Sequence, residues 1–223
     1  MFFLLVSAIV CDEEVYGMAK KKHVVLLGAS VGEGWKIEGL PERLNQSGSI
    51  SYRFEYVGDY QFDKSQTLRN ILQRQQDKPD AIILKECAVY FPGDLRQYQE
   101  LIKEWIKECK DAAVIPIPTT VVPVAKATSL KAIVKDLLKP LLGKASSTQR
   151  LEALLQYNDW IRSYTKQEGL ALLDLEKTLR TSEADRRLRE DLHSGDGLHL
   201  NGQAYGLLDQ IVMPVLNEAF SKK

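Results

Sequence analysis

Cysteine is scarce in this chain of 223 residues, which has only Cys11, Cys87 and Cys109. Three cysteines so far apart in the sequence do not form a disulfide framework. No group of cysteine, histidine and carboxylate residues has the spacing of a metal site either. We therefore expect reduced thiols, no bound metal and no cofactor.

An excess of charge of either sign is also missing, because 30 Lys and Arg residues balance 30 Asp and Glu residues. The longest runs of like charge are short, as in the lysines at residues 20–22. A nucleic-acid surface usually needs clustered positive charge. The composition therefore argues against a nucleic-acid partner.

Long hydrophobic runs are absent too. The apolar run MFFLLVSAIVC at residues 1–11 has the length of a signal-peptide core and falls well short of the roughly 20 residues that a membrane span needs. No positive charge precedes it, and acidic residues follow it. We expect no stable membrane span, and interpret residues 1–21 as an N-terminal extension or a signal segment. The compartment stays open between the cytoplasm, which is favoured, and secretion.

The rest of the chain alternates short apolar runs with stretches of helical periodicity. The strand candidates are residues 23–28, 50–58, 80–85, 112–118 and 170–175, and the helix candidates are 65–76, 95–110, 147–169 and 203–220. This alternation predicts an α/β three-layer sandwich with a five-stranded parallel sheet, formed by residues 22–223 as a single domain. Ligands of such sheets bind at the carboxyl ends of the strands.

Ser30 follows the first predicted strand, in the stretch HVVLLGASVGEGW at residues 23–35. One interpretation is a phosphate-binding turn made by Gly28, Gly32 and Gly34. Their spacing fits neither the dinucleotide-binding pattern nor the P-loop pattern. The sequence therefore gives little support to phosphate binding here.

Ser30 itself has two further interpretations, as the nucleophile of an α/β hydrolase or as a helix cap. The segment GASVG matches the nucleophile elbow of α/β hydrolases letter by letter. That elbow comes after several strands, whereas only one predicted strand precedes Ser30. The serine could also be an ordinary cap at the start of a helix.

A second polar stretch, SGDGLHLNGQAYG at residues 194–206, leads into the last predicted helix. It holds Asp196 and His199 three positions apart. A serine nucleophile needs a base, and the base needs an acid that fixes its tautomer. The loop can supply both if it approaches the end of the first strand. Asp196 as a turn residue and His199 as a structural histidine are the simpler alternatives.

The chain resembles the SGNH (GDSL-type) hydrolase family over residues 22–220. The resemblance rests on Gly-Ala-Ser after the first strand, on the βα alternation, and on DGLHLN before the final helix. It implies a flavodoxin-like fold and a small-molecule acyl ester as substrate. Ser30 would be the nucleophile, His199 the general base and Asp196 its orienting acid. The oligomeric state is not fixed by the sequence.

The chain departs from the family at two motifs. Ala29 stands where the family usually has Asp, a position outside the triad. The resemblance implies an oxyanion hole made by the backbone N–H groups of Ser30 and Gly58. The family also lends an Asn side chain to that hole, but this chain has LKEC at residues 84–87. Losing one oxyanion donor costs about 10²–10³ in rate.

Lys85, Glu86 and Cys87 are therefore expected to line the substrate pocket, where the Lys85 cation could compensate for the missing donor. Lys85 and Glu86 could equally form an ion pair at the strand end. His23 and His193 lack a partner pattern and are expected to be structural or exposed. Two other functions stay open, a non-catalytic ligand-binding protein on the same fold and an acyltransferase.

Overall fold

The structure is a computed structural model that describes residues 21–44, 50–126, 133–134, 136, 138–140 and 143–222. The N-terminal segment, interpreted above as an extension or a signal, lies outside these residues except for its last position. Within the described ranges, no helix combines the length and the apolar character that crossing a membrane requires.

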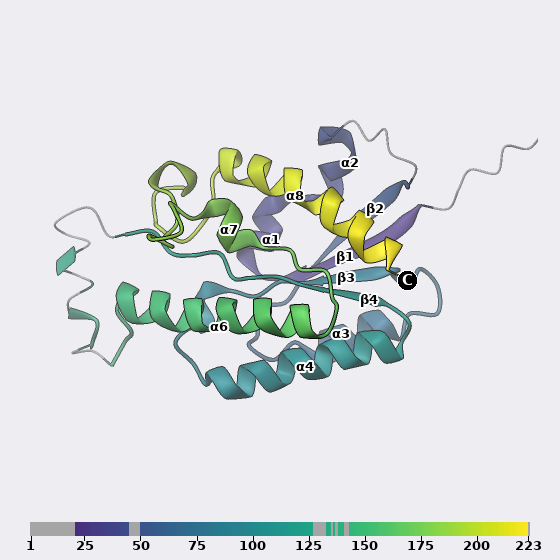
Figure 1. Cartoon of the computed structure of the whole chain (residues 1–223), viewed down its shortest axis with the longest axis horizontal. Coiled ribbons are helices and arrows are strands. Elements are labelled where there is room, and N and C mark those ends of the chain that lie inside the picture. The colour runs from purple at the N-terminus through teal and green to yellow at the C-terminus, as the bar shows by residue number, and fades with distance from the viewer. Residues whose placement is uncertain are drawn as a thin grey trace, which may run out of the picture.

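A parallel β-sheet forms the centre of the protein (Figure 1). Its strands are β1 (Lys22–Gly28), β2 (Tyr52–Gly58), β3 (Ala81–Leu84) and β4 (Ile115–Pro118), in the order β2-β1-β3-β4. All three pairings are parallel. The inner strands β1 and β3 are apolar and buried almost throughout, as expected where helices cover both faces of a sheet.

The expected fifth strand at residues 170–175 is wrong, because the described residues form a sheet of four strands. Leu173 makes only a single parallel bridge, with Thr119. Lengthening this ladder toward its amino end would need an N–H donor at Pro118, which proline lacks. Toward the carboxyl end, the chain enters helix α7 (Leu175–Leu179) at once.

Helices cover the sheet in two layers (Figure 1). One face carries α1 (Ser30–Trp35), α2 (Leu40–Arg43), α7 and α8 (Gly202–Ser221), and the other carries α3 (Ser65–Leu72), α4 (Leu95–Asp111) and α6 (Ser147–Gln167). Short 3₁₀ turns lie at Ile37–Gly39, Ala88–Tyr90 and Glu190–Leu192. Val24 and Leu26 pack into the first layer, and Val25 and Leu27 into the second. The predicted three-layer sandwich is confirmed.

Helix α6 begins at Ser147, the first residue of the helix predicted over residues 147–169. Its N-cap is Ser146. The Ser146 side chain accepts a hydrogen bond from the backbone N–H of Gln149, and the Gln149 side chain accepts one from the backbone N–H of Ser146. This reciprocal capping box satisfies two backbone donors at once, which explains why the helix starts at this position.

Candidate active site

Ser30 lies in the turn between β1 and α1, at the carboxyl edge of the sheet. Ala29 occupies the N-cap position of α1 in an extended conformation and makes no side-chain cap. Ser30 is therefore the first helical residue, and its hydroxyl is not a helix cap. The Ser30 Oγ atom instead lies 3.2 Å from the Nε2 atom of His199.

The Tyr56 side chain fixes the backbone of this turn. Its hydroxyl lies 3.2 Å from the carbonyl oxygens of both Gly28 and Ala29, to which it donates. Its ring also explains a glycine in the turn, because a Cβ on Gly32 would lie 3.0 Å from a ring carbon of Tyr56. Gly32 is thus accounted for by packing and not by phosphate binding.

The loop that carries Asp196 and His199 is a short hairpin. Its ends pair through an antiparallel bridge between His193 and Leu200. Gly195 and Gly197 have φ angles of +112° and +76°, in the region that favours glycine. Immediately after the hairpin, the Asn201 side chain caps α8 by accepting a hydrogen bond from a backbone N–H. These features explain why the residues around the Asp-x-x-His motif are Gly and Asn.

Asp196 holds the His199 ring. Its Oδ1 atom accepts hydrogen bonds from the backbone N–H groups of Leu198 and His199, both at 2.8 Å. Its Oδ2 atom lies 2.5 Å from His199 Nδ1. Burial opposes ionisation of this carboxyl, but the hydrogen bonds from His199 and the backbone outweigh it and lower the pKa of Asp196 to about 2.

The ionised Asp196 determines the tautomer of the His199 ring. A carboxylate only accepts hydrogen bonds, so the proton of a neutral His199 ring lies on Nδ1. The Nε2 atom then carries a lone pair that faces the Ser30 hydroxyl. This is the orientation that a general base needs toward its nucleophile.

A small cavity of about 30 Å³ opens beside Ser30. It is lined by Ser30, Val31, Lys85, Glu86, Cys87, Ala88, Val89, Val122, Leu198 and His199. The structure thus brings the residues expected in the substrate pocket, Lys85, Glu86 and Cys87, to the same cavity as Ser30 and His199.

Gly58 is not among the described residues that line this cavity. It ends β2, the edge strand of the sheet, and is exposed. The next residue, Asp59, donates its backbone N–H to the carbonyl of Gly28. Successive N–H groups of a strand point in opposite directions. The N–H of Gly58 therefore points away from β1, and of the two expected backbone donors only Ser30 lines the cavity.

The alternative of an ion pair between Lys85 and Glu86 is wrong. Glu86 instead pairs with Lys64 at 2.8 Å, and both of these side chains are only 1% exposed. Lys85 Nζ donates to the backbone carbonyl of Glu86 at 3.0 Å. Consecutive residues of extended chain point to opposite faces, which separates the two side chains. No local pattern around Lys64 marks it in the sequence.

The two cysteines in the described part of the chain, Cys87 and Cys109, are free and buried, as expected for reduced thiols. Burial raises the pKa of Cys109 to about 12, so this thiol stays protonated. Cys11 lies outside the described residues.

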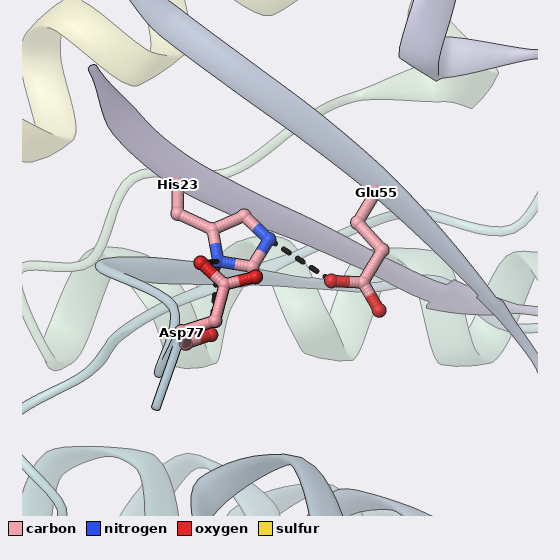
Figure 2. Close-up of side chains that lie close together, drawn as sticks. All are labelled: His23, Glu55 and Asp77. Carbon is pink, nitrogen blue, oxygen red and sulfur yellow. Dashed lines mark hydrogen bonds and ion pairs between the residues drawn. The ribbon is translucent and has the colours of Figure 1, made fainter. Parts of the chain in front are cut away.

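Figure 2 shows three side chains that could hold a metal ion in the part of the chain that the structure describes, His23, Glu55 and Asp77, at the opposite end of β1. Their ligand atoms lie within 4.8 Å of one another, and His23 Nε2 is 3.0 Å from the Glu55 carboxylate. Both carboxylates already have a cation, however. Arg74 contacts the two oxygens of Glu55 at 2.9 Å, and Arg53 pairs with Asp77. The group is best explained as an ion-pair network between neighbouring elements.

The other histidine outside the candidate site is His193. Its Nδ1 atom accepts a hydrogen bond from the backbone N–H of Gly195 at 2.9 Å. His193 therefore helps to shape the hairpin before α8, and the expectation of a structural or exposed role for His23 and His193 agrees with both environments.

Comparison with known proteins gives similarity in structure only. No protein-family model and no curated protein sequence matches the chain. Among solved structures, the chain is similar to a GDSL-like lipase from Bacteroides thetaiotaomicron, with a TM-score of 0.62, 16% identity, and 89% of each chain covered. It is also similar to a protein designated an SGNH hydrolase from Slackia heliotrinireducens (TM-score 0.59, 18% identity, 90% of this chain and 100% of that chain).

A third similar structure is an acetyl-xylooligosaccharide esterase from Geobacillus, with a TM-score of 0.59 and 12% identity over 87% of this chain and 94% of that chain. In all three cases the aligned region spans nearly the whole of both chains, so the similarity concerns the complete sandwich. The chain has the fold of the SGNH (GDSL-type) hydrolases.

Proposed function

We propose that the protein is a serine hydrolase that cleaves a carboxylic ester or a related acyl substrate, and that residues 22–223 form this single hydrolase domain. The observation that carries the proposal is the continuous chain of contacts from Asp196 through His199 to Ser30. If Ser30, Asp196 and His199 had only unrelated structural roles, they would not be expected to form this chain of contacts beside a cavity. The fold of known lipases and esterases supports the same conclusion.

In the first half-reaction, the Ser30 Oγ atom attacks the acyl carbonyl carbon while its proton moves to His199 Nε2. The carbonyl oxygen becomes an oxyanion, which the backbone N–H of Ser30 stabilises. His199 then gives its proton to the leaving alcohol oxygen as the ester C–O bond breaks. Asp196 stabilises the imidazolium between these two steps. The products are a free alcohol and an acyl group on Ser30.

In the second half-reaction, a water molecule attacks the acyl carbon and gives a proton to His199 Nε2. The bond to Ser30 Oγ breaks, Oγ takes the proton back from His199, and the acid leaves. The side chains of Asp196 and His199 are about half exposed, at 47% and 50%, so water has direct access to this step. An alcohol in place of water would make the protein an acyltransferase.

The cavity favours a short acyl group. At about 30 Å³, the space beside Ser30 is small. Two of the similar structures carry names that refer to acetyl esters, an acetyl xylan esterase and the acetyl-xylooligosaccharide esterase. We therefore propose acetyl or similarly short esters as the substrates.

The test is hydrolysis of p-nitrophenyl acetate by the wild type and by Ser30→Ala and His199→Ala. Each variant should lose about 10³-fold or more in kcat/KM, because the residues act as one unit. Ser163→Ala is the matched control, since its exposed hydroxyl bonds only within helix α6. Undiminished hydrolysis by Ser30→Ala contradicts the proposal.

Two further outcomes separate the alternatives. Ester formation with an added alcohol acceptor, at the expense of hydrolysis, identifies an acyltransferase. Binding of a short ester by a folded wild-type protein, without any turnover, identifies a non-catalytic binding protein.

A further inference from the structure

Lys85 lies directly beneath the turn that carries Ser30. It follows β3, and its side chain points to the same face of the sheet as Ile83, the face that α1 and α8 cover. The Cβ and Cδ atoms of Lys85 lie 3.3 and 3.5 Å from the position that a Cβ on Gly28 would take. Lys85 also lines the cavity beside Ser30. A larger residue than glycine at position 28 would push this lysine away.

The Lys85 ammonium is a buried cation without a carboxylate partner on its own segment. The residue is 1% exposed, and its Nζ atom donates to the backbone carbonyl of Glu86 at 3.0 Å. The Glu86 carboxylate is bound to Lys64 instead, at 2.8 Å. An ammonium carries three N–H donors, so it can bind an oxygen in the cavity in addition to the backbone carbonyl.

A cation in this position suits a group that becomes negative during the reaction. Burying a charge is costly unless it is paired and hydrogen-bonded, and a buried charge acts strongly because water does not screen it. The attack by Ser30 creates such a negative oxygen within the same cavity. We propose that Lys85 donates a hydrogen bond to the substrate carbonyl oxygen and stabilises the oxyanion, a role that rests on the proposed hydrolase function. Lys85 is then a catalytic residue.

The protonation of Lys85 gives this role a pH dependence. Burial lowers the pKa of Lys85 to about 8, and the cation of Lys64 acts in the same direction, while Cys87 and Glu86 oppose the change. His199 faces the cavity from the loop before α8. The lysine is mostly charged at neutral pH and loses its proton as the pH rises through about 8.

The test is the variant Lys85→Met, which keeps an unbranched side chain one atom shorter than that of lysine and removes its charge. We expect kcat for p-nitrophenyl acetate to fall by about 10²-fold or more, with KM little changed, because the lost interaction belongs to the transition state. The variant should be at least as stable in urea as the wild type, since a buried charge is gone. The control is Lys110→Met, which removes a half-exposed lysine at the far end of α4.

The wild-type pH profile is an independent measurement. In the wild type, kcat should fall as the pH rises through about 8. A wild-type kcat that stays level through pH 9, or a Lys85→Met variant that keeps wild-type kcat or does not fold, overturns the role of Lys85. Failure of the hydrolase proposal looks different, because Ser30→Ala would then hydrolyse the ester as fast as the wild type does.

Discussion

The Nε2 atom of His199 lies 3.2 Å from the Oγ atom of Ser30, although 169 positions separate the two residues in the chain. The contact follows from the parallel sheet, because the turn after β1 and the hairpin before α8 lie at the same edge. A backbone hydrogen bond of 2.9 Å from the N–H of Ala125 to the carbonyl of Gly197 anchors the hairpin beside the segment that follows β4. The candidate triad is thus assembled by the fold and not by local sequence.

The substitution Asp196→Asn should lower kcat by about 10³ to 10⁴ while leaving KM nearly unchanged. An Asn amide turned toward His199 Nδ1 would favour the tautomer with its proton on Nε2, which cannot accept the Ser30 proton. Steady-state kinetics with a short aryl ester measure the effect. Asp191→Asn is the control, because Asp191 is a half-exposed carboxylate that pairs with Arg189. Equal rates for the two variants contradict the role of Asp196.

The buried residue Asn158 on α6 should be important for stability. Its side-chain oxygen accepts from the N–H of Val121 at 2.7 Å, and its amide donates to the carbonyl of Val121 at 2.9 Å. Asn158→Leu leaves two buried backbone groups unpaired, at a cost of about 1–3 kcal/mol each. The next residue, Val122, lines the cavity, so activity should fall as well.

Urea unfolding of Asn158→Leu gives the free-energy change directly. Asn70→Leu is the comparison, because its partner is another exposed side chain, that of Gln66. If both variants lose the same small amount of stability, the two hydrogen bonds to Val121 do not have the proposed importance.

The environment of Glu176 should make the stability of the fold depend on pH. Its buried side chain contacts the guanidinium groups of Arg162, Arg180 and Arg186. Burial opposes its ionisation, but the arginine contacts outweigh burial and lower its pKa from 4.5 to about 2. A carboxyl with a lowered pKa in the folded state stabilises the protein above its unfolded pKa. That stabilisation, about 3 kcal/mol from a shift of this size, is lost as the pH falls from about 4.5 to 2.

Unfolding free energies of the wild type and Glu176→Gln at pH 6 and pH 3 test this prediction. The variant should be less stable at pH 6, and the difference between the two proteins should shrink at pH 3. A difference that stays constant between the two pH values would mean that the ionised Glu176 carboxylate does not stabilise the fold in this way.

Much of the sheet was predictable because buried parallel strands are continuous apolar runs, as in β1 and β3. The prediction of a fifth strand was wrong because Pro118 has no N–H to donate to that ladder. Hydropathy does not show such a missing donor. The candidate triad could be proposed from the sequence. Asp196 and His199 are only three positions apart, and Ser30 directly follows the end of a predicted strand. The roles of Lys64, Tyr56 and Asn158 could not be proposed in the same way, because they depend on single long-range contacts that leave no periodic pattern.

The most direct test of the central claim is intact-protein mass after treatment with a fluorophosphonate, which phosphonylates an activated serine as fluoride leaves. The wild type should gain one adduct, and Ser30→Ala should gain none under the same conditions. An unlabelled but folded wild type, or an equal adduct on Ser30→Ala, would contradict the assignment of Ser30 as the nucleophile.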